Sequence, residues 1–148
     1  MKIGIIGGTG PAGSGLALRL NVAGYDVVIG SRDKARSVEK VKELQSLWPS
    51  HNLSIQGGDN ADAVKCDLVV VATPWDSTAT IVGEFASQLA GKIVVTMANA
   101  LVKVGKEFQP LVPPRGSIAA HVQAEIPLSK VVAALQHLPA KELGNLNH

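Results

Sequence analysis

The sequence is poor in aromatic residues and in cysteine, and its charges nearly balance. Phe, Trp and Tyr together make up 3% of the chain. Its core must therefore come from Val, Ile, Leu and Ala, the composition of a buried parallel sheet covered by helices. The single cysteine, Cys66, cannot form a disulfide within the chain, and this favours a reducing, cytoplasmic location. A formal net charge of +2 gives no support for a nucleic-acid partner.

Long apolar runs and metal-binding patterns are also lacking. No stretch approaches the ~20 apolar residues that cross a bilayer, so we expect no membrane association. The first residues lead directly into glycines and do not resemble a signal peptide. The four histidines show none of the spacings that hold zinc, so we expect no metal site.

Strand and helix patterns alternate along the 148 residues, which predicts one Rossmann-type domain spanning residues 1–148. The expected fold is α/β, a doubly wound parallel sheet of about six strands in the order 3-2-1-4-5-6, with helices on both faces. Strands are predicted at residues 3–6, 25–29, 52–56, 68–72, 92–96 and 131–135. Helices are predicted at residues 11–22, 33–47, 60–64, 75–89 and 116–125. Residues 97–115 and the tail after residue 139 carry no predicted element.

A glycine motif follows the first predicted strand. Gly8, Gly10 and Gly13 form a G-x-G-x-x-G pattern that opens a predicted helix, with Pro11 near its first turn. Gly8 is expected to permit the tight turn, Gly10 to let the backbone approach a pyrophosphate, and Gly13 to let helix and strand pack closely. The free N–H groups of the helix would meet the phosphates. The alternative is an ordinary turn of an α/β protein.

The end of the second predicted strand indicates which dinucleotide binds. An NAD site usually has Asp or Glu here to hold the ribose 2′-hydroxyl. This chain has Ser31 and Arg32, with Arg36 one helical turn later, and Thr9 in the glycine loop offers a further hydroxyl. Guanidinium groups favour a 2′-phosphate and hence NADP(H). Asp33 would either compete for the ribose or cap the following helix. The two arginines could also be a solvated helix start.

Several segments make the interpretation more specific. They are GGTGPAGSGLALRL, VVIGSR, TPW, GKIVVTMANAL, LVPPRGS and VVAALQHLPA. Together they resemble the NADPH-dependent reductases of the deazaflavin coenzyme F-420 (F420). The resemblance implies an oxidoreductase that transfers a hydride between NADP(H) and F420. Because the cofactors supply the reactivity, no catalytic acid or base is expected.

The resemblance also implies a set of binding residues, all of which contact NADP(H) or lie beside the deazaflavin. Those at the pyrophosphate and 2′-phosphate are Gly8, Thr9, Gly10, Pro11, Ala12, Gly13, Ser31, Arg32 and Arg36. Those at the bridging ribose and phosphates and at the nicotinamide ribose are Thr73, Pro74, Trp75, Ala79, Met97 and Asn99. Those at the nicotinamide, with orienting roles for the first two, are His137, Leu138, Pro139 and Ala140.

Two departures from the family pattern bear on activity. Gln136 stands where family members carry His, and glutamine cannot titrate. Family members also continue into a C-terminal portion that helps to form the deazaflavin pocket, and we expect this chain to lack it. Two alternatives therefore stay open: an NADP(H)-binding domain without turnover, or an NADPH-dependent reductase of a flavin, quinone or ferric chelate. A homodimer is a further possibility.

Overall fold

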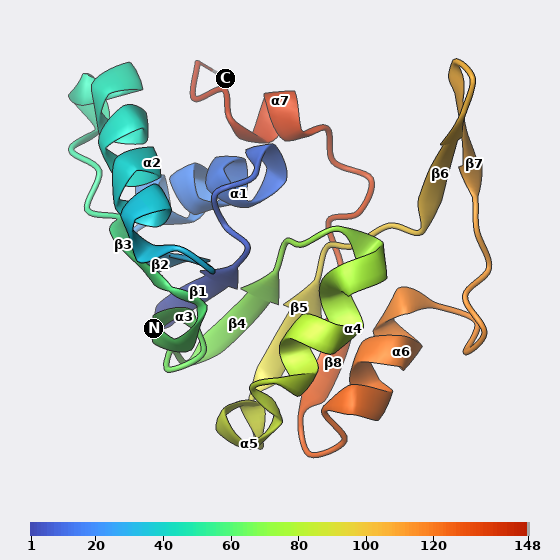
Figure 1. Ribbon diagram of the computed structural model, residues 1–148. Helices are drawn as coiled ribbons and strands as arrows, with labels where there is room; N and C mark the ends of the chain where they lie inside the picture. Colours follow the sequence, from blue (N-terminus) through green and yellow to red (C-terminus); the bar gives the residue numbers. More distant parts are fainter. Residues whose placement is uncertain (148) are drawn as a thin grey trace.

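A six-stranded parallel sheet runs through the centre of the computed structural model, which describes residues 1–147 (Figure 1). The strands are β1 (Lys2–Ile6), β2 (Asp26–Ser31), β3 (Gln56–Asp59), β4 (Leu68–Val71), β5 (Ile93–Thr96) and β8 (Lys130–Ala133). Their order in the sheet is β3-β2-β1-β4-β5-β8. This confirms the predicted doubly wound fold. β2 and β3 are added on one side of β1, and β4, β5 and β8 are added on its other side.

Helices cover both faces of the sheet. One face carries α1 (Pro11–Val22) and α2 (Lys34–Leu47). The other carries α3 (Asn60–Ala63), α4 (Trp75–Gly83), α5 (Ala86–Leu89) and α6 (Ile118–Glu125). A short helix, α7 (Ala140–Leu143), packs on α1, and a 3₁₀ turn, η1 (Pro49–His51), follows α2. No helix in residues 1–147 is long and apolar enough to cross a membrane.

Two apolar cores lie on opposite sides of the sheet. Side chains alternate along a strand, so Val70 of β4 joins the core under α1 and α2, whereas Val69 and Val71 join the core under α4 and α6. Both cores consist mainly of Val, Ile, Leu and Ala, as the shortage of aromatic residues predicted. This packing fixes the carboxyl ends of β1, β2, β4 and β5 along one edge of the sheet.

The third strand was predicted too early in the chain. Residues 52–56 were expected, but β3 is Gln56–Asp59 and includes Gly57 and Gly58. Leu53 and Ile55 are buried without pairing, which explains why their pattern resembled a strand. A Cβ at Gly57 would lie 2.7 Å from the backbone nitrogen of Val38 in α2. The close approach of α2 thus requires glycine where a strand pattern normally shows β-branched residues.

Three other elements differ from the prediction. The single helix expected over residues 75–89 is divided into α4 and α5. The unassigned segment contains an antiparallel hairpin, β6 (Leu101–Val104) and β7 (Glu107–Pro110), which projects from the domain (Figure 1). The tail contains α7, reached through a turn in which Leu135 has a left-handed φ of 68°.

Candidate functional site

The candidate site lies at the carboxyl ends of the strands, where β1 and β4 are neighbours. Successive helices lie on opposite faces at this point, so the loops after β1 and β4 diverge. In doubly wound folds such a divergence forms the crevice in which ligands bind. The predicted binding residues in the loops after β1, β2, β4, β5 and β8 all belong to this edge of the sheet.

The turn after β1 depends on its glycines and on a hydrogen bond to β2. Gly7 has a φ of 68°, in the left-handed region that favours glycine. The N–H of Gly8 donates to the carbonyl of Gly30 at 2.9 Å, which ties the turn to the end of β2. The left-handed residue of the turn is Gly7. Gly8 also contributes to the tight turn by its lack of a side chain, since a Cβ there would lie 2.9 Å from the carbonyl oxygen of Ile5. A Cβ at Gly13 would lie 2.7 Å from Cα of Gly8, so Gly13 does allow the expected close packing.

Helix α1 begins without an internal cap. Its N-cap is Gly10, which has no side chain, and Pro11 occupies the first helical position. The backbone N–H groups of Ala12 and Gly13, in the first turn, therefore have no side-chain partner. A Cβ at Gly10 would meet only the carbonyl of Gly7, at 3.8 Å, so the protein itself does not require glycine there. Free amides and open space at a helix start are the properties of an anion site.

Asp33, the acidic residue that follows β2, caps the next helix. The N–H of Ala35 donates to the Asp33 carboxylate at 2.9 Å, and Asp33 is thus the N-cap of α2. Ser31 is buried, and its hydroxyl accepts the N–H of Asp33 at 3.3 Å. The structure therefore supports the capping alternative for Asp33.

Arg32 and Arg36 remain available for a ligand. Both are exposed, and within residues 1–147 neither forms a salt bridge. Arg36 and Thr9 line the same open cavity of about 510 Å³ together with Lys40. The structure thus brings the glycine loop and the first turn of α2 together, as a phosphate on the adenosine ribose would need.

The loop after β4 lies directly against the glycine turn. A Cβ at Gly7 would be 2.6 Å from Cγ2 of Thr73. The Thr73 hydroxyl is 2.9 Å from the buried hydroxyl of Thr78, which also donates to the carbonyl of Pro74. Trp75 packs against the core under α4, which favours a role in packing over stacking on a cofactor. Ala79 lies one turn farther along the same helix.

The remaining predicted residues fall into two places. Asn99 and Gln136 line a cavity of about 260 Å³ at the ends of β5 and β8, between the base of the hairpin and the start of α6. Met97 does not line this cavity and is buried in the core under α1 and α2. Ala140 instead lines a cavity with Thr9 and Pro11, near the glycine loop.

His137 and Leu138 lie in the turn that leads from β8 to α7. Both are exposed, and the N–H of Leu138 donates to the carbonyl of Leu135 at 3.2 Å. These two side chains line none of the cavities that contain the other predicted residues.

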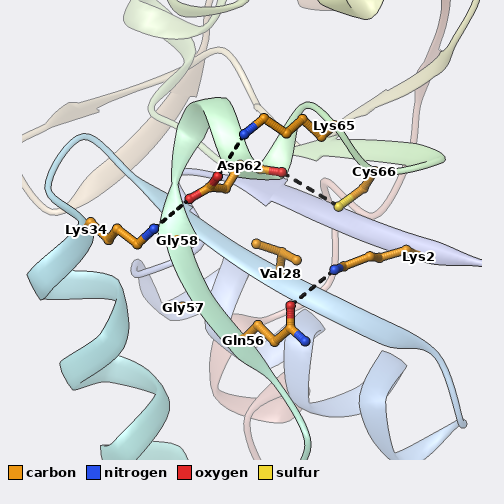
Figure 2. Close-up of a pocket in the computed structure, with 9 residues that line it drawn as sticks. All are labelled: Lys2, Val28, Lys34, Gln56, Gly57, Gly58, Asp62, Lys65 and Cys66. Carbon is orange, nitrogen blue, oxygen red and sulfur yellow. Dashed lines mark hydrogen bonds and ion pairs between the residues drawn. The ribbon is translucent and has the colours of Figure 1, made fainter.

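A separate polar hollow of about 350 Å³ lies beside α3 on the face of β2 and β3 (Figure 2). Asp62 accepts hydrogen bonds there from Lys34 and Lys65, each at 3.0 Å. These bonds lower the pKa of the Asp62 carboxyl below its usual range and raise that of Lys34. Burial raises the pKa of the Cys66 thiol, as expected for a core cysteine. The ion pair between Lys34 and Asp62 thus joins the start of α2 to α3.

Comparison with known proteins agrees with this geometry. Residues 2–100 match the family described as NADP oxidoreductase coenzyme F420-dependent. The whole chain aligns at 37% identity with an F420-dependent NADP reductase of Methanocaldococcus jannaschii and spans 68% of its length. A reductase of the same name from Methanothermobacter marburgensis is 33% identical over 96 residues, which are 43% of its length.

Solved structures show the same relationship. A crystal structure of a putative F420-dependent NADP reductase from Arthrobacter superposes with a TM-score of 0.77 at 32% identity, covering 95% of this chain and 65% of that one. An imine reductase from Bacillus cereus, at 16% identity and a TM-score of 0.62, shares the fold alone. The family match over residues 2–100, the full-length alignment and the glycine turn agree. The chain belongs to the coenzyme F420-dependent NADP oxidoreductase family.

Proposed function

We propose that this chain binds NADP(H) at the carboxyl edge of the sheet and transfers a hydride between its nicotinamide and coenzyme F420. The observation that carries the proposal is the uncapped start of α1 together with Arg32 and Arg36, neither of which forms a salt bridge within residues 1–147. The names of the family and of its relatives supply the reaction. The chain spans 68% of the length of the Methanocaldococcus jannaschii reductase.

The residues fit a dinucleotide with an additional phosphate. The free N–H groups of Ala12 and Gly13 would hold the pyrophosphate, aided by the positive end of the helix dipole. Arg32 and Arg36 would hold the 2′-phosphate through charged hydrogen bonds, each worth roughly 1.5–3 kcal/mol. Thr9 faces the same cavity as Arg36 and would add a hydroxyl.

The chain's own contribution to the reaction is orientation. The bound nicotinamide supplies or accepts the hydride, and no protein group needs to carry a proton for this step. Thr73 supports the glycine turn, while Asn99 and Gln136 offer amide groups at the end of β5 and beyond β8. We place the nicotinamide at the cavity lined by Asn99 and Gln136. His137 and Leu138 follow Gln136 in the chain and would act as orienting side chains, whereas Ala140 would lie toward the pyrophosphate.

The alternative of NADP(H) binding without turnover is favoured by one observation: His137 and Leu138 are exposed and do not line the cavity that contains Asn99 and Gln136. A deuterium-transfer experiment separates the two functions. NADPH deuterated at C4 of the nicotinamide is incubated with the chain and oxidised F420, and both products are analysed by mass spectrometry. Deuterium in reduced F420 establishes direct transfer. If NADPH binds but no deuterium reaches F420, the function would be NADP(H) binding without turnover.

We also propose a single NADP(H)-binding domain, a cytoplasmic location and a homodimer. The free, buried thiol of Cys66 supports a reducing location. Ile93 and Val132 support self-association, because they are 45% and 46% exposed on the same face of neighbouring strands. Light scattering on the purified chain would show a mass near twice 15.4 kDa for a dimer.

A further inference from the structure

Asn60 is a buried polar residue that the nucleotide-binding interpretation leaves without a role. It is the first residue of α3, and its exposed fraction is 7%. Its side-chain Oδ1 accepts a hydrogen bond of 3.3 Å from the backbone N–H of Gly7, 53 positions earlier in the chain. A side chain from the far side of the sheet therefore reaches the glycine turn.

The contact falls at the residue where the chain changes direction. Gly7 adopts a left-handed φ of 68°, and the next N–H, that of Gly8, donates to the carbonyl of Gly30. Both amides at the bend are thus bound inside the protein and point away from the crevice. The orientation of the following peptides, up to the free amides of Ala12 and Gly13, depends on this bend.

Gly30 provides the room that Asn60 needs. A Cβ at Gly30 would lie 3.0 Å from Oδ1 of Asn60 and 2.9 Å from Cβ of Ala63. Gly30, the glycine of the sequence GSR at the end of β2, therefore has a structural function, in addition to the nucleotide contacts proposed for this segment. Gly7, Gly30 and Asn60 form one junction between β1, β2 and α3.

The position of α3 does not depend on Asn60 alone. The Asp59 carboxylate accepts the N–H of Asp62 at 2.7 Å, and the two residues form a reciprocal capping box. Asp62 also binds Lys34 and Lys65 (Figure 2). Loss of the Asn60 side chain would therefore free the Gly7 amide without removing the contacts that anchor the helix.

We infer that Asn60 is a positioning residue for the dinucleotide, which holds the Gly7 peptide so that the amides at the start of α1 face the pyrophosphate. The inference rests on the proposed function, because it concerns how the same site is organised. It requires no contact between Asn60 and the ligand. Its effect falls on nucleotide affinity, since the chemical step proceeds normally once the nucleotide is bound.

The test compares Asn60→Ala with Asp59→Ala, a neighbouring change that weakens the α3 cap but leaves the Gly7 contact. Binding of NADPH is measured by fluorescence titration, and kcat is measured with F420 at saturating NADPH. Asn60→Ala should raise the Kd for NADPH by roughly 5- to 50-fold, the effect of one lost hydrogen bond and one orphaned amide. Its kcat should stay within about twofold of the wild-type value, and Asp59→Ala should leave the Kd within about twofold.

Amide hydrogen exchange in the free protein gives a readout that needs neither nucleotide nor F420. In Asn60→Ala the Gly7 amide should exchange roughly tenfold faster, while the Gly8 amide stays protected by Gly30. Asn60→Ser, whose side chain is too short to reach Gly7, serves if the alanine variant does not fold.

The outcomes distinguish the two proposals. Equal loss of NADPH affinity in Asn60→Ala and Asp59→Ala would show a merely structural role and overturn the inference. So would an unchanged Kd in Asn60→Ala, or a Gly7 amide that stays protected. Failure of the wild-type chain to bind NADPH would instead overturn the proposed function and, with it, the role of Asn60.

Discussion

The N–H of Ala35 donates to the carboxylate of Asp33 at 2.9 Å, so the acidic residue beside β2 caps α2. In an NAD site, an acidic residue at this end of the strand would hold the ribose 2′-hydroxyl. Here the carboxylate accepts the helix N–H, and the guanidinium groups of Arg32 and Arg36 form no salt bridge in the described part of the chain. This arrangement underlies the predicted preference for NADP(H).

Replacing the arginines should remove that preference. Arg32→Ala and Arg36→Ala are each expected to raise the Kd for NADPH by about tenfold or more, because each loses a charged hydrogen bond to the 2′-phosphate. The Kd for NADH should stay within about twofold, and NADH thus serves as the internal control. Titration of each variant with both nucleotides checks this, and equal losses for NADPH and NADH would contradict a 2′-phosphate contact.

Substitution of Gly30 by alanine should disturb both the sheet and the site. The added Cβ would lie 2.9 Å from Cβ of Ala63 and 3.0 Å from Oδ1 of Asn60. Overpacking of this kind typically costs about 1–3 kcal/mol of unfolding free energy. Urea denaturation should show that loss, and NADPH should bind more weakly. Gly24→Ala is an informative comparison, since a Cβ there meets nothing within 4 Å but the φ of 91° is strained. It should lower stability without changing NADPH affinity.

Arg19 should hold the C-terminal helix on α1. Its guanidinium donates to the carbonyls of Leu143, Glu142 and Asn145 at 3.2, 3.0 and 2.5 Å, at the negative end of α7. Arg19→Ala should lower the unfolding free energy by about 1–3 kcal/mol. It should also speed hydrogen exchange in residues 140–145. Arg19→Lys should retain part of the effect, because lysine keeps the charge but lacks the planar fork. Unchanged exchange in α7 would contradict the anchoring role.

The Asp62 carboxylate should make stability depend on acid pH. Hydrogen bonds from Lys34 and Lys65 lower its pKa in the folded chain, whereas an unfolded aspartate titrates near 3.9. The stabilisation is therefore present above about pH 4 and is lost as the pH falls through the lower folded value. Thermal melts between pH 6 and pH 2 should show a steeper acid decline for the wild type than for Asp62→Asn. Parallel declines would contradict this assignment.

Local patterns predicted most of the fold and the placement of the candidate site residues at one edge of the sheet. The apolar runs of β1, β4 and β5 and the glycines after β1 carry their signal within a few residues, so the strand order followed from handedness. β3 was misplaced because its glycines fit the close approach of α2, a tertiary requirement that no local pattern contains. The hairpin of β6 and β7 lies in a segment whose prolines suggested irregular structure.

The supporting residues of the site could not be predicted for the same reason. Asn60 and Gly7 are 53 residues apart, and Arg19 lies 124 residues from Leu143, so only the folded chain brings each pair together. One signal was present: Asn60 is a polar residue at the start of a short crossover helix. The residues proposed to contact the nucleotide could be predicted from the sequence because glycine and arginine have distinctive roles beside a phosphate.

The proposed hydride transfer between NADPH and coenzyme F420 can be measured in a spectrophotometric assay with NADPH and oxidised F420, run in parallel with NADH. We expect loss of deazaflavin absorbance with NADPH and a rate at least about tenfold lower with NADH, since the 2′-phosphate contacts are missing. Absence of turnover with tightly bound NADPH, or equal rates with both nucleotides, would overturn the proposed function.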